Sequence, residues 1–357
     1  MSTTKRPLTV AVTALNATDN PAPGVAVIRA LHLAEGSCRR IVGLTYDALD
    51  SGIYASDLAD AAYLLPYPSQ GLEPFRERIL EIHAREQFDV IVPTVDAELP
   101  SFIELEPELR ELGIGMFLPT REQFDLRSKV HLVELGERAG ILVPKTAVLS
   151  DVGEMAKVHE RVPYPFYVKG VFYGAHLARS LDEAIVGFHK SAAQWGLPVI
   201  VQQRVDGDEF DVVAVGDGHG GLVGAVPMKK TLLTDKGKGW AGIAVKDPEL
   251  LRVTEAFMRA SSWRGPCEVE VIRDKEGVYH LLEVNPRFPA WCYMSAGAGM
   301  NLPLAVVQLA AGVPPDPLGA FVPGTMFVRI SLDQIASVAD FETIATTGEL
   351  VRDGGRR

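Results

Sequence analysis

Two apolar segments, CEVEVI and VYHLLEV, flank the short polar sequence RDKEG within residues 267–284. This pattern is typical of a β-hairpin. Side chains two apart in a strand share a face, so Glu268 and Glu270 point to one side of the first strand, and Glu283 and Asn285 share a face of the second. A two- or four-residue loop pairs even positions of the first strand with odd positions of the second. We therefore expect an antiparallel hairpin with all four polar side chains on one surface.

Three carboxylates on one surface repel one another unless a cation lies among them. Mg²⁺ or Mn²⁺ suits such oxygen ligands, usually with substrate phosphates completing the shell. Arg287 follows Asn285 by two residues, and a guanidinium binds phosphate oxygens well. An ordinary solvated hairpin face is the alternative, but the combination of ExE with ExNPR favours a metal and phosphate site.

Composition limits the classes of protein. The chain has 357 residues, of which 47% are apolar and 23% charged, as in ordinary globular proteins. The net charge of −11 opposes nucleic-acid binding, and no apolar run is long enough to cross a membrane. The N-terminal apolar run is too short for a signal peptide, and the three cysteines are widely spaced. These features predict a cytoplasmic protein that binds neither nucleic acid nor membrane.

The first third alternates apolar strands with amphipathic helices. Strands are expected at 8–15, 41–44 and 88–95 and in GIGMFLP, with helical spacing between them. Such alternation predicts a parallel sheet covered by helices, a Rossmann-like α/β domain. The first turn lacks GxGxxG, which argues against a dinucleotide site.

The rest of the chain divides into further units. We expect an α/β domain at 1–125, a second part with a small α+β lid at 126–205, an antiparallel sheet with the metal site at 206–320, and a tail at 321–357. The fold class is therefore mixed, α/β followed by α+β.

The sequence EVNPR, with an acid on the preceding strand, resembles the ATP-grasp superfamily, which includes biotin carboxylase, the carbamoyl-phosphate synthetase large chain and D-alanine–D-alanine ligase. The order of units over about residues 1–312 is also similar. The resemblance implies an ATP-grasp fold and two Mg²⁺ ions that bridge the phosphates of ATP. It assigns Glu270, Glu283 and Asn285 as metal ligands and Arg287 as a catalytic, phosphate-binding residue.

Two lysines acquire a role from the same resemblance. Lys129, at the start of a helix expected from about Lys129 to Ala139, is similar to the first phosphate-binding lysine. Lys169, at the end of PFYVKG, is similar to the second, which also serves in catalysis. The following loop, GVFYGAHLARS, has fewer glycines than the superfamily usually has, a departure from its pattern of backbone amides that cover the phosphates. His176 could substitute, although a structural histidine is favoured.

The segment VIVQQRVDGDEFDV resembles the superfamily's adenine-binding hinge. The resemblance implies that backbone groups of Gln203 and Val205 bind the edge of the base and that the Gln202 side chain reaches its amino group. Glu209 matches the position that binds the ribose hydroxyls.

The implied activity is ATP-dependent ligation, in which a small-molecule carboxylate becomes an acyl phosphate and an amine attacks it, with ADP as a product. The superfamily leaves two alternatives: a bicarbonate-activating enzyme similar to biotin carboxylase, and a nucleotide-binding protein without activity. A P-loop kinase is excluded because GxxxxGK[ST] is missing. A homodimer is allowed but not specified.

The acceptor site is less defined. MKKTLLTDKGKGWAG is either a solvated basic loop or an anion-binding loop, and FPAWCYMSAGAGMN either lines the acid pocket or packs. Arg329 binds a substrate carboxylate or forms a surface ion pair.

Overall fold

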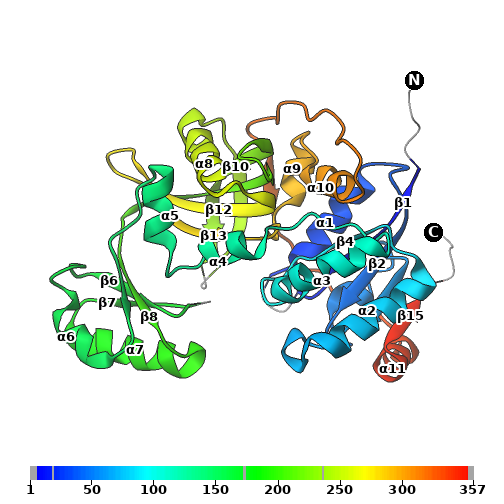
Figure 1. The fold of residues 1–357 in the computed structure, drawn as a ribbon, viewed down its shortest axis with the longest axis horizontal. Helices are drawn as coiled ribbons and strands as arrows, with labels where there is room; N and C mark the ends of the chain where they lie inside the picture. Colours follow the sequence, from blue (N-terminus) through cyan, green and yellow to red (C-terminus); the bar gives the residue numbers. More distant parts are fainter. Residues whose placement is uncertain (1–5, 18–19, 172–173, 235–236, 353–357) are drawn as a thin grey trace.

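The computed structural model describes residues 6–17, 20–171, 174–234 and 237–352. Three sheets make up the fold, and they lie at three corners of the molecule (Figure 1). None of the helices in these ranges is both long and apolar enough to cross a membrane.

The N-terminal sheet has the order β15-β3-β2-β1-β4. Its strands β1 to β4 are parallel, as alternating strands and helices predict. Strand β3 was not among the predicted strands, and GIGMFLP contributes only an isolated bridge from Gly115 to Val90. The strands and helices of this part of the chain are β1 (Leu8–Thr13), β2 (Cys38–Thr45), β3 (Ala61–Leu64), β4 (Val90–Val92), α1 (Pro23–His32), α2 (Leu72–Glu86), α3 (Leu99–Glu111) and α4 (Arg121–Leu126).

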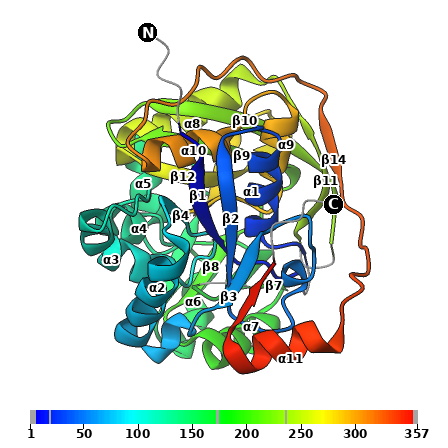
Figure 2. The same ribbon diagram turned by 90° about the vertical axis from the view of Figure 1, so that its right-hand side faces the viewer.

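The C-terminal segment returns to this first sheet. Strand β15 (Glu349–Val351) pairs antiparallel with β3, and α11 (Val338–Thr347) precedes it. Figure 2 shows this segment beside β3, far from the strands that come before it in the sequence. Residues 321–352 are therefore packed against the N-terminal sheet at one end and extend a second sheet at the other.

The second sheet is antiparallel throughout, with the order β13-β12-β9-β10-β11-β14. One face packs on α5 and α8 through Phe210, Val212 and Val269. The other face packs on the N-terminal domain through Val213, Val215 and their neighbours. The strands of this sheet are β9 (Gly207–Asp217), β10 (Leu222–Leu233), β11 (Gly239–Ala244), β12 (Arg264–Asp274), β13 (Tyr279–Asn285) and β14 (Met326–Val328). The helices of this part of the molecule are α5 (Leu132–Ala139), α8 (Pro248–Ser261), α9 (Tyr293–Gly297) and α10 (Leu302–Ala310).

The third sheet lies in the segment expected to form the lid and has the order β5-β8-β6-β7. Its apolar residues pack on α6 and α7, which cover one face (Figure 1). Helix α7 starts where the Ser180 hydroxyl accepts the N–H of Glu183, as expected of an N-cap. The strands of this sheet are β5 (Thr146–Leu149), β6 (Phe166–Lys169), β7 (Ala175–Ala178) and β8 (Val199–Gln203), and the helices beside it are α6 (Met155–Val158) and α7 (Leu181–Trp195).

Helix α5 begins later than the sequence suggests. We expected it from about Lys129, but the regular helix starts at Leu132, and Lys129 lies in the preceding turn. Gly140 ends it in the left-handed conformation, with φ of 65°, which confirms the expected stop.

Candidate active site

The acidic hairpin is formed by β12 and β13 at the edge of the second sheet. Glu268 pairs with Asn285, and Glu270 pairs with Glu283. The side chains between them on β12, such as Val269, belong to the core on the other face. The prediction that these four polar side chains share one surface is therefore confirmed.

The register arises differently from the prediction. Near the turn, Val271 pairs with Leu281 and Ile272 with His280. Odd positions therefore pair with odd ones and even with even, whereas the prediction paired even positions with odd ones. The register then shifts between Glu270 and Val271, so that Leu282 is the extra residue of a β-bulge. Without this bulge, Glu283 would lie on the core face in place of Val284. The polar surface thus depends on an irregularity that the strand pattern does not reveal.

Hydrogen bonds hold the side chains of the hairpin together. The Asn285 amide donates to Glu268 at 3.0 Å and to Glu270 at 2.7 Å. Trp291 Nε1 donates to the other oxygen of Glu268 at 2.7 Å. Both Glu268 and Asn285 are buried. The positions of Glu268 and Asn285 are therefore fixed by neighbours, a form of preorganisation that binding sites require.

A buried lysine, Lys230 on β10, lies among the carboxylates. Its Nζ is 3.1 Å from Asp211, 3.2 Å from Glu209 and 3.3 Å from Glu270. Lys230 was predicted only as part of a basic loop, and Asp211 was not among the predicted site residues. The signal was present in the alternation of β9, where Glu209 and Asp211 share a face.

Burial and charge shift the pKa of several groups in this cluster. Burial raises the pKa of Glu268, Glu283 and Asp211 above the usual range. Burial acts on Glu270 in the same direction, but the charges of Lys230, Arg287 and Lys129 together with a hydrogen bond from Lys230 outweigh it, and the pKa of Glu270 is lowered. Burial opposes the charge of Lys230, yet the attraction of Asp211 and Glu270 raises its pKa well above the usual value. The carboxylates around Lys230 therefore stabilise positive charge at this place in the site.

We expect Lys230→Met to destabilise the fold by about 3–5 kcal/mol, because it leaves buried carboxylates without their cation. Lys229→Met is the matched control: the Lys229 side chain is 37% exposed, against 7% for Lys230, and pairs with the exposed Asp208. The free energy of unfolding from urea titrations measures both. Equal stability of the two variants would contradict the structural role of Lys230.

Lys129 and Lys169 both face this cluster. Lys129 Nζ lies 3.3 Å from Glu283, and Lys169 Nζ donates to the Gln202 side chain at 2.6 Å. Burial and the neighbouring charge of Lys129 lower the pKa of Lys169 to about 8. Both predicted phosphate-binding lysines are thus brought to the predicted metal ligands from different parts of the chain.

The pKa of Lys169 leads to a pH-dependent prediction. Below pH 8 its ammonium is charged and can neutralise a phosphate; above pH 8 the free protein loses that charge. We expect the affinity for Mg·ATP to fall by up to about tenfold per pH unit between pH 8 and 9, because binding then requires uptake of a proton. Lys169→Arg stays charged and should lack this component. Calorimetric titrations at pH 7, 8 and 9 measure it, and identical slopes in both proteins would contradict it.

The predicted adenine hinge follows β8. The N–H of Gln203 donates to the carbonyl of Lys145 at 2.8 Å, so it serves strand pairing and would not reach a base. The Gln202 side chain is buried and bonded to Lys169. Val205 lies in the connection between β8 and β9, and Glu209 begins the inward face of β9 beside Lys230. The hinge lies next to the lysines, while its base contacts stay predictions.

Arg287 lies at the other end of the hairpin. Its Nη1 donates to Glu268 at 3.1 Å, and its Nε lies 3.7 Å from Asp96, which comes from the N-terminal domain. Arg329 is also partly buried here: burial lowers its pKa to about 10, and the charge of Glu268 opposes that shift. Its Nε donates to the carbonyl of Gly239 at 3.1 Å.

The basic loop and the lid loop lie only partly within the described residues. Lys230 is buried in the acidic cluster, whereas Lys229 and Lys238 lie at the surface. Lys236 lies outside the described residues, as do positions 172 and 173 of GVFYGAHLARS. Trp291 and Cys292 of the segment after β13 are buried in the core shared with the N-terminal domain.

The donor set fits a magnesium ion. Among the described residues, His, Cys, Asp and Glu side chains alone form no group of three arranged to hold a metal. The candidate set is two glutamates and an amide, Glu270, Glu283 and Asn285, which suits an ion that takes one or two carboxylates and completes its shell with phosphates. Burial raises the pKa of Glu283, and a nearby cation would relieve this cost.

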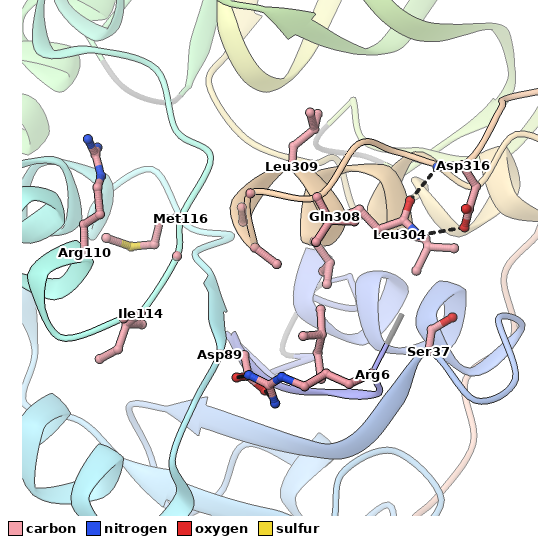
Figure 3. Close-up of a pocket in the computed structure, with 18 of the residues that line it drawn as sticks. Arg6, Ser37, Asp89, Arg110, Ile114, Met116, Leu304, Gln308, Leu309 and Asp316 are labelled. Atoms are coloured by element: carbon pink, nitrogen blue, oxygen red, sulfur yellow. Dashed lines mark hydrogen bonds and ion pairs between the residues drawn. The ribbon is translucent and has the colours of Figure 1, made fainter. Parts of the chain in front are cut away.

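A separate cavity of about 710 Å³ lies at the amino ends of strands β1, β2 and β4 of the N-terminal sheet (Figure 3). It is lined by Arg6, Asp89 and Gln308 among others, and no predicted site residue contributes to it. Arg6 pairs there with Asp89, and Gln308 bonds with Asp316. The charged groups labelled in Figure 3 therefore do not form a cluster of carboxylates like that of the acidic hairpin.

Comparison with known proteins gives one family and several relatives. The family described as "ATP-grasp in the biosynthetic pathway with Ter operon" matches residues 197–329, which contain the hinge and the hairpin. Over 251 residues the chain is 28% identical to the carbamoyl phosphate synthase large chain of Thermomicrobium roseum, covering 65% of this chain. The chain spans 22% of the length of that relative.

Solved structures share the fold. The biotin carboxylase domain of Hydrogenobacter thermophilus 2-oxoglutarate carboxylase, solved as a dimer with MgADP, ADP and bicarbonate, gives a TM-score of 0.69 at 18% identity; the match covers 88% of this chain and 72% of that one. The L-amino acid ligase from Bacillus licheniformis gives 0.65 at 17% identity, with 86% and 75% covered. These likenesses show an ATP-grasp fold, as the sequence predicted.

Proposed function

Because this chain belongs to the ATP-grasp superfamily, we propose that it is an ADP-forming ligase that joins a small-molecule carboxylate to an amine. One observation carries the proposal: Glu270 and Glu283 face each other across β12 and β13, and Lys129, Lys169 and Arg287 converge on the same surface. This combination of carboxylates and cations is what a magnesium–nucleotide complex requires.

The nucleotide end of the site is the side with the two lysines. We infer that Lys129 and Lys169 bind phosphate oxygens of ATP, and that Glu270, Glu283 and Asn285 hold Mg²⁺ or Mn²⁺. The bound cation would neutralise charge on the phosphates. Val205 would bind adenine and Glu209 the ribose. The neighbour from Hydrogenobacter thermophilus, solved with MgADP, supports this nucleotide and metal.

The chemistry follows from the charge of the substrate. A carboxylate is a poor electrophile, so an oxygen of the acid attacks the γ-phosphorus of ATP, the bond from γ-phosphorus to the bridging oxygen breaks, and ADP leaves. The amine then attacks the acyl carbon, and inorganic phosphate departs. Arg287, at the end of the site away from the lysines, is placed to bind oxygens of the transferred phosphoryl group. Positioning and electrostatic stabilisation supply most of the rate, and no nucleophilic side chain is needed.

The proposal is tested by product analysis. Purified protein with Mg·ATP is screened against pools of carboxylic acids, with hydroxylamine as a small nucleophile that traps acyl phosphates. We expect ADP and phosphate to appear only with particular acids, and a bicarbonate arm tests a carboxylase-like activity. Formation of AMP, or ATP binding with no turnover in any pool, would overturn the proposed ligase. Size-exclusion chromatography with light scattering tests the homodimer, which stays a prediction.

A further inference from the structure

Asp96 brings a carboxylate from the N-terminal domain to the end of the site that contains Arg287. We call this the acyl end, because the acid substrate would be activated there. It lies in the turn between β4 and α3, at the carboxyl end of the parallel strands, where ligands of such sheets usually bind. Its side chain is 13% exposed, and its Oδ1 lies 3.7 Å from Arg287 Nε. Asp96 also lies close enough to Glu283 to help raise the pKa of that residue. The Asp96 carboxylate therefore faces the second sheet.

The turn that carries Asp96 is held rigidly. Glu98 is fully buried beneath it and accepts the backbone N–H groups of Thr94 at 2.8 Å and Val95 at 2.9 Å. The hydroxyls of Thr13 and Tyr46 also donate to the same carboxylate. Four donors from three parts of the chain fix the turn, so the position of Asp96 is built into the fold.

The charges at this end constrain what can bind. Arg287 is flanked by Glu268 at 3.1 Å and Asp96 at 3.7 Å. Glu268 is buried and is also bonded to Asn285 and Trp291, which disperse its charge within the protein. The contact between Arg287 Nε and Asp96 Oδ1 is longer than a hydrogen bond, so it is an ion pair. A simple carboxylate that approached Arg287 would be repelled by Asp96.

We propose that the acid substrate is an amino acid, with a protonated amino group close to the carboxylate that is activated. Asp96 binds the ammonium group while Arg287 binds the carboxylate. The two protein charges are thereby matched by the two charges of the zwitterion. This inference rests on the proposed ligase function and specifies the substrate class of the same site.

The test compares amino acids with their analogues that lack the amino group. The pairs are L-alanine and propionate, L-leucine and 4-methylpentanoate, and L-glutamate and glutarate, each with Mg·ATP and hydroxylamine. In the wild-type protein we expect one amino acid to exceed its analogue in kcat/KM for ADP release by about 10- to 100-fold, the usual value of a charged hydrogen bond. In Asp96→Asn this ratio should fall to about 1, and Asp96→Glu should recover part of it.

The outcomes separate the inference from the proposed function. If Asp96→Asn lowers both members of a pair by the same factor, Asp96 only orients Arg287 and the inference is wrong. If acids without an amino group are the better substrates of the wild-type protein, the inference is also wrong while the ligase function stands. If no acid of either kind releases ADP, the proposed function fails and the inference with it. Asp333→Asn, an exposed aspartate outside the site, is the control for loss of a charge.

Discussion

Glu283→Ala is expected to lower kcat/KM for ADP release by about 10³-fold or more, because it removes a carboxylate from the predicted metal site. The fold should survive, since burial already raises the pKa of Glu283 and its charge is repelled by Glu270. Measurements are the rate of ADP release and the thermal unfolding midpoint of the metal-free protein.

The matched control for this variant is Glu276→Ala, in the exposed turn of the same hairpin. It removes the same charge without touching the site and should keep wild-type turnover. Full turnover by Glu283→Ala would show that Glu283 is not a metal ligand. Loss of the folded state would instead show that the Lys129–Glu283 contact is needed for folding.

Arg287→Lys is expected to reduce kcat by about 10²-fold with little change in the dissociation constant of Mg·ATP. Lysine keeps the positive charge, but it cannot bind two oxygens through a planar fork. The split between kcat and nucleotide affinity distinguishes an action at the transferred group from a contribution to nucleotide binding.

Arg273→Lys, at an exposed position of the same strand pair, is the control and should behave as the wild type. A fall in ATP affinity with unchanged kcat would place Arg287 in nucleotide binding and contradict its assignment to the acyl end. The two measurements are steady-state turnover and calorimetric titration of Mg·ATP.

The sequence predicted the parts of this fold that depend on local pattern. Alternation along CEVEVI placed Glu268 and Glu270 on one face because β12 is regular there. Apolar runs separated by helices indicated the parallel sheet, although β3 was missed because two of the four residues of AAYL are alanines, which are depleted in strands. GIGMFLP forms a single bridge, since its two glycines and terminal proline disfavour a strand.

What the sequence could not predict depends on contacts between distant segments. The bulge at Leu282 is invisible in the alternation, yet it keeps Glu283 on the site. Lys230 of β10 and Glu270 of β12 meet at Asp211 because β9 lies between β10 and β12, an order that local pattern does not give. Asp96 reaches Arg287 only because the N-terminal domain packs on the second sheet. The return of β15 to the first sheet has the same origin.

The central claim is that carboxylate and amide oxygens of neighbouring strands hold a divalent cation against the phosphates of a nucleotide. A crystal structure with ADP and Mn²⁺, with the ion located by its anomalous scattering, tests this most directly. We predict manganese bound by Glu270, Glu283 and Asn285, with the phosphates of ADP contacting Lys129 and Lys169. Manganese or ADP bound elsewhere, with these side chains left in their present ion pairs, would contradict the claim.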